Sequence, residues 1–187
     1  ISTFRPFIHK YLYYDNTLVD RPSRYFELSS VENLYLCTSG LGSKKVSSFV
    51  SNLHPNLDMV EKTQVFPLVN VYESDSELTS ESNITDWAIK YFRSKTKINN
   101  IKSSDIFNYC YAMLHHQIFL STYQKDLQRS SPRIPFLQKH FKTISSIGKK
   151  LILLHLNFSN IKITSLKPTP ETREFLNTTR RIDYSIE

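Results

Sequence analysis

The sequence predicts an α+β fold, with a mostly antiparallel β part at the N-terminus packed against a helical part at the C-terminus. Short runs of β-forming residues separated by turn residues occupy positions 1–73. Apolar residues recur at helical spacing through positions 84–156. Positions 157–187 show no sustained pattern, which predicts an irregular C-terminal extension. We therefore expect a single domain over residues 1–187 that is built from two structural parts.

The composition indicates a folded, basic protein. Hydrophobic residues make up 40% of the 187 positions, enough for one core. The chain has 24 Lys and Arg against 17 Asp and Glu, a net charge of +7. This excess suits a nucleic-acid partner, but on charge alone an ordinary basic surface explains it equally well. The densest apolar run, 151–156, is far shorter than the ~20 residues that span a bilayer. We expect no membrane partner and a cytoplasmic location.

The first half contains several segments with the composition of strands. Pairs of turn residues occur at 15–16 and within 20–23. Pro67 cannot donate a ladder hydrogen bond, so it should lie at a sheet edge, a bulge or the start of a strand. The segment around it is mostly apolar and is expected to lie inside a sheet. A strand or an extended segment is predicted at 11–14, and strands are predicted at 33–38, 45–51 and 65–72.

A glycine- and lysine-containing loop lies between two of these predicted strands. Residues 39–45 hold two of the three glycines in the chain, followed by Lys44 and Lys45. Glycine permits positive φ and close approach of the backbone to a ligand, and lysine side chains suit phosphate. The spacing of a nucleotide-binding P-loop is absent. A DNA contact and a plain solvated hairpin loop remain equally good interpretations of this segment.

The composition changes sharply between the two halves. Residues 73–83 (ESDSELTSESN) are acidic, rich in serine and free of aromatic residues. Such a segment is typical of a linker or a surface loop. We therefore predict a mobile connection between the β part and the helical part.

The second half shows helical patterns. Thr85 is a candidate N-cap for the first, and Ser103 or Ser104 for the second. Gly148 costs about 1 kcal/mol relative to Ala inside a helix, so its position predicts a close backbone approach and not a helix end. Helices are predicted at 85–94, from 103 to about 114, at 117–127 and at 141–156.

A rigid break separates the last two helical patterns. In Pro132-Arg133-Ile134-Pro135, each proline fixes its own φ and pushes the preceding residue out of the helical region. Arg133 is therefore expected to point in a fixed direction.

The sequence predicts neither a catalytic centre nor a metal site. Adjacent histidines such as His115 and His116 do not face one metal from the same side of a helix. His155 lies on an apolar helix face, where a hydrogen-bonded core histidine is the expected role. Cys37 and Cys110 are too few for a zinc site, and Cys110 is expected to be a buried structural thiol. Sequence motifs for nucleotides, methyl-donor cofactors and nucleases are absent.

The helical half also carries an ordered series of short motifs: Ile106-Phe107-Asn108-Tyr109, Tyr111-Ala112-Met113-Leu114-His115, Pro132-Arg133-Ile134-Pro135, Gly148-x-x-Leu151 and Leu154-His155-Leu156. This series resembles the C-terminal specificity region of type ISP restriction-modification enzymes, large single-chain proteins with nuclease, helicase and adenine methyltransferase parts. Arg5-Pro6-Phe7 and Asp20-Arg21-Pro22 fit the opening of that region. Two positions depart from it, because Phe119 stands where Tyr is usual and Leu120 where Arg is usual.

The resemblance implies a specificity domain that selects the duplex-DNA sequence at which the rest of the protein methylates adenine and cleaves. It implies double-stranded DNA and the methyltransferase part of the same polypeptide as partners. No cofactor is implied for these residues. The other parts would use S-adenosylmethionine, and ATP with Mg²⁺ if nuclease and helicase parts are present. Because the family continues past the last residue, the chain is expected to be a piece of a longer protein.

Loop placement and charge select the candidate DNA contacts. An alternative is that the helical part docks on the methyltransferase part without reading bases, in which case exposed apolar residues should gather on the helices. A stand-alone enzyme would need a pocket with convergent titratable groups, which we do not expect. The candidates for phosphate contact are Arg24, Lys44 and Lys45, and those for reading bases or backbone are Asn16, Arg21 and Ser43.

Overall fold

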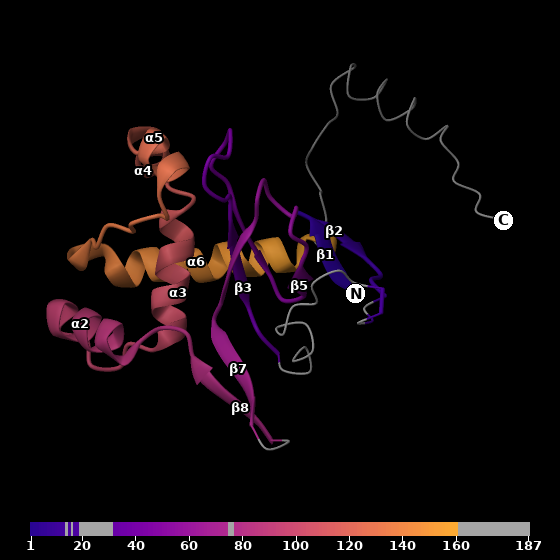
Figure 1. Cartoon of the computed structure of the whole chain (residues 1–187). Coiled ribbons are helices and arrows are strands. Elements are labelled where there is room, and N and C mark those ends of the chain that lie inside the picture. Colours follow the sequence, from indigo (N-terminus) through magenta and orange to yellow (C-terminus); the bar gives the residue numbers. More distant parts are fainter. Residues whose placement is uncertain (14, 16, 19–31, 75–76, 161–187) are drawn as a thin grey trace.

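A computed structural model describes the chain except for residues 14, 16, 19–31, 75–76 and 161–187. The described part is a mixed α+β domain, as the sequence predicts. Small sheets lie on one side of Figure 1, and the helices lie across from them, with α6 (Phe141–Leu156) running behind α3 (Ser103–Met113) toward the sheets. No helix among the described residues is long and apolar enough to cross a bilayer.

The first strands form a hairpin earlier than the sequence predicts. Strand β1 (Ser2–Arg5) pairs antiparallel with β2 (Ile8–Lys10) and parallel with β5 (His54–Pro55). Residues 11–13 belong to no strand, so the strand considered there does not form, and residue 14 lies outside the described part of the chain. Phe7 turns the hairpin at a positive φ of 64°, and its ring packs edge-on against Phe49. That packing offsets a backbone conformation that residues with a side chain seldom adopt.

The central sheet has the order β4-β3-β6 and is antiparallel throughout. Side chains along β3 point alternately to the two faces of the sheet. Leu36 lies in the core shared with the helices, and Tyr35 and Cys37 lie in a smaller cluster on the other face. The strands predicted at 33–38 and 45–51 are confirmed. Pro67 ends an edge strand, also as predicted. The elements are β3 (Tyr35–Thr38), β4 (Ser48–Ser51) and β6 (Gln64–Pro67).

The predicted strand 65–72 is two strands, because the chain changes direction at Leu68. The Leu68 N–H donates to the Leu34 carbonyl (2.8 Å), and the side-chain amide of Asn83 donates to the Pro67 carbonyl (2.8 Å). The prediction that this segment lies inside a sheet is also wrong: β6 is an edge, with Val65 and Phe66 exposed. The second strand is β7 (Val69–Ser74).

The linker predicted at 73–83 is wrong. Most of it is β8 (Glu77–Ser82), which pairs in register with β7 from Val69–Ser82 to Ser74–Glu77. Every residue of β8 is exposed, so neither face shows the apolar alternation by which strands are recognised in a sequence. Asn70 and Asn83 add a side-chain hydrogen bond (3.1 Å) near the base of this hairpin.

The helices follow the predicted pattern with two corrections, one at the start of α3 and one in the middle of the predicted helix 117–127. Thr85 caps α2 (Asp86–Thr96) by accepting from the Ala88 N–H, as predicted. The serine cap predicted for α3 is wrong, since α3 begins at Ser103 and the Asp105 carboxylate accepts from the Lys102 N–H (2.9 Å). The single helix predicted at 117–127 is broken at Tyr123 into α4 (Gln117–Thr122) and α5 (Gln124–Arg129).

Helices α3 and α6 pack closely at Gly148, as the sequence predicts. A Cβ at Gly148 would lie 1.9 Å from the Asn108 carbonyl oxygen and 3.2 Å from the Ala112 Cβ. The Ser145 hydroxyl donates to the Asp105 carbonyl at 2.9 Å. Small residues therefore allow the two backbones to touch, and this contact sets the position of everything that α3 supports.

A small cluster of polar aromatic groups joins α3, α6 and β4. Tyr111 and His155 Nδ1 share a hydrogen bond of 2.5 Å, so His155 is hydrogen-bonded as the sequence predicts, but it is only partly buried and lies at the edge of the core. His115 Nε2 lies 3.2 Å from the Ser48 hydroxyl. Desolvation, and secondarily the His155 charge, lowers the pKa of His115 from 6.5 to about 4. Burial also lowers the pKa of His155.

Because the pKa values of His115 and His155 are lowered in the folded chain, we expect the domain to become less stable in mild acid. Between about pH 6.5 and the folded pKa near 4 of His115, the unfolded chain binds a proton that the folded chain excludes. The free energy of unfolding must therefore fall as the pH falls through this window. Urea unfolding at about pH 7.5 and pH 5 measures the loss. The variant His115→Phe should lose less stability over that interval than the unmodified chain. Equal losses would contradict a neutral, partly buried His115.

Candidate nucleic-acid interface

The loop of residues 40–45, called here the glycine loop, connects β3 to β4 and needs both of its glycines. A Cβ at Gly40 would lie 2.2 Å from the Lys62 carbonyl oxygen. Gly42 has a φ of +72°, which residues with side chains seldom adopt. The Gly40 N–H donates to the Glu61 carbonyl at 3.0 Å. The backbone of the loop is therefore packed tightly against residues 61–62.

Two charged side chains fix this loop further. Lys62 Nζ donates to the carbonyls of Leu41 (3.2 Å) and Gly42 (3.1 Å). The Lys44 N–H donates to a Glu61 carboxylate oxygen at 2.8 Å. Both contacts are made to the loop backbone, so they hold its shape and leave the Lys44 side chain exposed to solvent.

Helix α5 holds the glycine loop from the other side. The Gly42 N–H donates to the Gln128 carbonyl (2.8 Å), and Gln128 Nε2 donates to the Lys44 carbonyl (2.8 Å). Gln128 of the helical half thus makes two hydrogen bonds to the glycine loop of the β half, one as an acceptor and one as a donor. As a result, the glycine loop and α5 form one continuous surface.

Of the predicted contact residues that the structure describes, two are exposed and one is buried. Lys44 and Lys45 are exposed on the glycine loop. Ser43 is 3% exposed, and its hydroxyl lies 2.6 Å from the Gly40 carbonyl and 3.0 Å from the Glu61 carbonyl. In this conformation Ser43 organises the loop and offers no surface to a base.

Three of the predicted contact residues lie outside the described part of the chain, and their predicted role stays a prediction: Asn16, Arg21 and Arg24.

Next to α5, the Pro132–Pro135 segment is anchored to the core. The Tyr109 side chain is fully buried in α3, and its hydroxyl donates to the Pro135 carbonyl (2.6 Å) and accepts from the Leu137 N–H (2.9 Å). Desolvation raises the pKa of Tyr109, so the phenol keeps the proton that it donates. The two prolines and this anchor fix the backbone that carries the exposed Arg133.

Removing the Tyr109 hydroxyl is expected to loosen this segment. The variant Tyr109→Phe leaves the Pro135 carbonyl and the Leu137 N–H without their partner, at a cost of about 1–3 kcal/mol in the free energy of unfolding. Urea unfolding measures the cost, and hydrogen exchange should show faster exchange at Leu137. Tyr123→Phe is the matched control, since Tyr123 is half-exposed. Equal effects of the two substitutions would show that the anchor contributes nothing.

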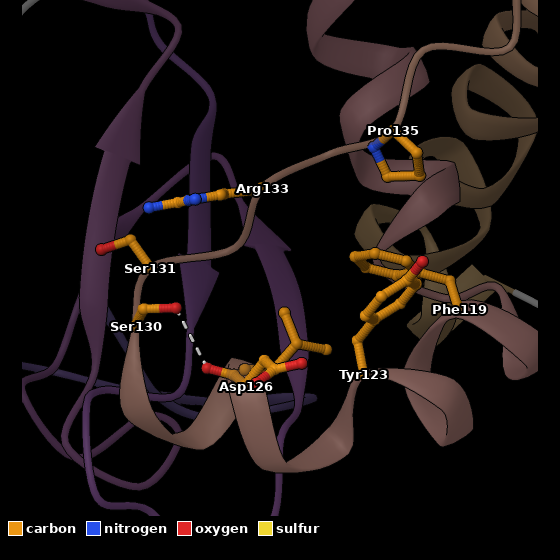
Figure 2. Close-up of a pocket in the computed structure, with 8 residues that line it drawn as sticks. Phe119, Tyr123, Asp126, Ser130, Ser131, Arg133 and Pro135 are labelled. Atoms are coloured by element: carbon orange, nitrogen blue, oxygen red, sulfur yellow. Dashed lines mark hydrogen bonds between the residues drawn. The ribbon is translucent and has the colours of Figure 1, made fainter.

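Between α5 and this segment lies a cavity of about 420 Å³ (Figure 2). Its walls combine aromatic rings, hydroxyls, a carboxylate and a guanidinium. In Figure 2, Tyr123 and Phe119 stand on one side and Arg133 extends from the segment on the other, with Asp126 below. The Ser130 hydroxyl donates to the Asp126 carbonyl at 3.1 Å. The lining residues are Phe119, Tyr123, Asp126, Leu127, Ser130, Ser131, Arg133 and Pro135.

Phe119 and Leu120, the two departures from the family pattern, lie close to this cavity in the chain. Phe119 is buried and forms part of the cavity wall. Leu120 is partly buried and packs against the core. Neither position supplies a polar group here, so the polar groups of the cavity come from residues between 123 and 133.

The positive charge is concentrated in the helical half. Residues 84–160 contain twelve Lys and Arg against three Asp, whereas residues 1–83 contain seven against ten acidic residues. Besides Arg133, Lys125 and Arg129 are exposed on α5, the helix that brackets the glycine loop. Lys142 and Lys149 line a second hollow, of about 310 Å³, between α3 and α6. The total charge alone does not show this asymmetry, although the signal is present in the sequence.

The described residues offer little for metal or thiol chemistry. Within them, no group of three or more His, Cys, Asp or Glu side chains is placed to hold a metal ion. Burial raises the pKa of the Cys37 thiol to about 12 and that of Cys110 to about 11, which keeps both protonated and unreactive.

Solved structures contain closely similar domains. One is a cryo-EM structure of a DrdV–DNA complex, with a TM-score of 0.79 and 29% identity over 94% of this chain and 18% of that chain. Another is a nuclease-deletion mutant of the type ISP restriction-modification enzyme LlaGI in complex with a DNA substrate mimic. It has a TM-score of 0.71 and 28% identity over 88% of this chain and 14% of that one. A search of curated proteins finds no match.

The chain thus spans less than a fifth of each of these two larger chains. The similarity to both structures covers the β part and the helical part of this chain together. A comparison with protein families covers both parts as well. The profile of the type ISP C-terminal specificity domain covers residues 1–185, and the chain belongs to that family.

Proposed function

We propose that this chain is a target-recognition domain for duplex DNA, which directs adenine methylation and cleavage by other parts of the same polypeptide to one base sequence. Its family and the two DNA complexes of its relatives support this proposal. The observation on which it rests most is the glycine loop, where exposed Lys44 and Lys45 stand on a backbone that is fixed by Lys62, Glu61 and Gln128.

A fixed loop suits phosphate binding for a physical reason. Lysine contacts to phosphate release counterions and set the register of a protein on the duplex, but they do not read sequence. When the backbone is already ordered, binding orders only the lysine side chains and loses less entropy. The exposed cations of α5, Lys125 and Arg129, extend the basic surface beyond the loop. Base contacts then come from side chains next to this surface.

The chemistry of methylation and cleavage is proposed to lie elsewhere in the polypeptide. A methyltransferase part would bind S-adenosylmethionine, and nuclease and helicase parts, if present, would use ATP with Mg²⁺. The share of the relatives' chains that this domain occupies, 18% and 14%, leaves room for such parts in a protein of similar size. In this arrangement the methyltransferase part is the domain's partner on the DNA.

The alternative role, docking without reading bases, has weaker support. Trp87 and Ile118 are 72% and 71% exposed, and Ile147 and Leu154 of α6 are each 54% exposed. These residues come from three different helices. The DNA complexes of the relatives do not favour docking over base reading.

A binding and selection experiment tests the proposal. The chain is mixed with randomised duplexes of about 30 base pairs at about 50 mM salt, and bound molecules are amplified and sequenced over several rounds. We expect one enriched motif, and an affinity that falls linearly as the logarithm of salt concentration rises. No binding at this salt concentration, or binding without an enriched motif, would overturn the proposed function.

A further inference from the structure

We infer that α2 carries a second nucleic-acid surface, which binds the unpaired bases of a DNA strand by stacking them on Trp87. The inference goes beyond the proposed function, because it concerns a single strand and a surface other than the glycine loop and α5. Three observations carry it: an exposed indole with a stacked ring behind it, a series of rings that connects this pair to the core, and lysines on the same side of the helix.

Trp87 is exposed on α2, with one flat face of its indole covered. The side chain is 72% exposed, and its ring stacks on the Tyr91 ring with centroids 5.3 Å apart and an interplanar angle of 16°. The two residues lie four positions apart, which places them on one side of the helix. Tyr91 is the one ring that contacts Trp87 within the described part of the chain. This nearly parallel pair leaves the second face of the indole open to a third ring.

A continuous series of ring contacts joins this pair to the core and holds it in place. Tyr91 packs against Phe136, with ring centroids 5.8 Å apart, and against Phe92, with centroids 6.1 Å apart. Phe92 in turn contacts Phe141 at 5.3 Å, and Phe141 is only 2% exposed. Each ring thus rests on the next, from a buried residue of α6 to the surface of α2. An indole supported in this way loses little conformational entropy when a base stacks on it.

The charges beside the rings suit phosphate. Lys95 is exposed, and its Nζ lies 5.8 Å from the centroid of the Tyr91 ring. Lys90 is exposed as well and follows Trp87 by three positions, so the two are neighbours on the helix surface. Asp86, in the first turn, is the single acidic residue of α2. Proteins bind single strands with surfaces of this composition, because bases stack on the rings while the cations contact the phosphates.

An unpaired nucleotide supplies both groups that this surface is suited to bind. Its base is a flat ring with a free face, and its phosphate is an anion for Lys90 or Lys95. Inside a duplex the faces of each base pair are covered by the neighbouring pairs, so a duplex cannot provide the ring. An acidic segment of another part of the polypeptide is the alternative occupant, but it would need two kinds of side chain to match one nucleotide.

This surface lies apart from the one proposed for duplex DNA. In Figure 1, α2 lies near the start of α3, whereas α4 and α5 lie beyond the other end of α3. The glycine loop is bound to α5 through Gln128. A single strand on α2 and a duplex on the glycine loop are therefore expected to bind at the same time.

Tryptophan fluorescence tests the inference directly, because Trp87 is the single tryptophan of the chain. An oligothymidylate of about 12 nucleotides is titrated into the chain at low salt, and an abasic strand of the same length is titrated in parallel. The abasic strand keeps the phosphates and lacks the bases. We expect the oligothymidylate to quench the fluorescence and the abasic strand to leave it nearly unchanged. Prior saturation with a duplex of about 30 base pairs should leave the quenching intact.

Variants separate stacking from charge, with the affinity measured on labelled strands. Trp87→Ala should weaken binding of the oligothymidylate roughly tenfold and leave binding of the abasic strand unchanged. Ile118→Ala on α4 is the matched control, because Ile118 is 71% exposed, and it should change neither affinity. The double variant Lys90→Ala, Lys95→Ala should weaken both strands and lower the slope of log affinity against log salt by about 1.4.

Three results would overturn the inference. Quenching by neither strand would leave a protein segment as the occupant of α2. Equal losses of affinity for both strands in Trp87→Ala would show that no base stacks on the indole. Quenching by the duplex as strong as that by the oligothymidylate would show that the surface does not require an unpaired base. None of these results affects the proposed function, which depends on selection among duplexes. Urea unfolding confirms that each variant is folded.

Discussion

Replacing Gly148 by alanine is expected to destabilise the domain by more than about 2 kcal/mol, although alanine is the better helix former by about 1 kcal/mol. The added Cβ would lie 1.9 Å from the Asn108 carbonyl oxygen and 2.7 Å from its carbonyl carbon, both of which are backbone atoms. The two helices would have to move apart, which loosens the packing around them and strains the Ser145–Asp105 hydrogen bond. Urea unfolding with linear extrapolation measures the change.

The matched control is Ser146→Ala on the exposed side of α6. It tests helix propensity alone and should be neutral or slightly stabilising. A Gly148→Ala variant as stable as the Ser146→Ala variant would show that α3 and α6 do not pack in the way described. Because α3 carries Tyr109, the destabilised variant should also show faster hydrogen exchange in the Pro132–Pro135 segment.

Removing three cations from the glycine loop and α5 should nearly abolish DNA binding at low salt. The triple variant Lys44→Ala, Lys45→Ala, Arg129→Ala loses three proposed phosphate contacts. Each contact contributes about 0.9 to the slope of log affinity against log salt. If the contacts contribute nothing at about 1 M salt, their loss lowers the affinity at about 50 mM by roughly three thousandfold. Titration of a labelled duplex at several salt concentrations measures both the affinity and the slope.

A second triple variant controls for net charge. Lys139→Ala, Lys142→Ala, Lys149→Ala removes the same charge from the region of α6, away from the glycine loop. It should weaken binding far less and should leave the slope almost unchanged. Equal losses in the two triple variants would mean that total charge, and not a particular surface, attracts the duplex.

The sequence predicted those elements that depend on local spacing. The apolar stripe with Gly148 in α6, the Thr85 cap and the strands containing Leu36 and Val50 all follow from periodicity and residue type. The exposed strand β8 was missed because it pairs through its backbone and buries no side chain. The break at Tyr123 was missed because apolar spacing continues through it.

The long-range contacts that form the candidate site could not be predicted from the sequence. The Gln128–Lys44 hydrogen bond joins residues 84 positions apart, and both are polar residues of ordinary surface type. The Tyr109–Pro135 hydrogen bond likewise pairs a residue of a predicted helix with a carbonyl that no sequence pattern indicates. Placement of Lys44 and Lys45 on an exposed loop was predicted, whereas burial of Ser43 depends on residues 61–62 folding beneath that loop.

Lysine footprinting of the chain bound to its selected duplex tests most directly whether the glycine loop and α5 form the DNA-binding surface. Exposed lysines are acetylated briefly with and without DNA, and the modification is located by mass spectrometry. We predict strong protection of Lys44, Lys45 and Lys125, with Lys142 and Lys149 modified equally in both states. Protection of Lys142 and Lys149 with full modification of Lys44 and Lys45 would contradict the account.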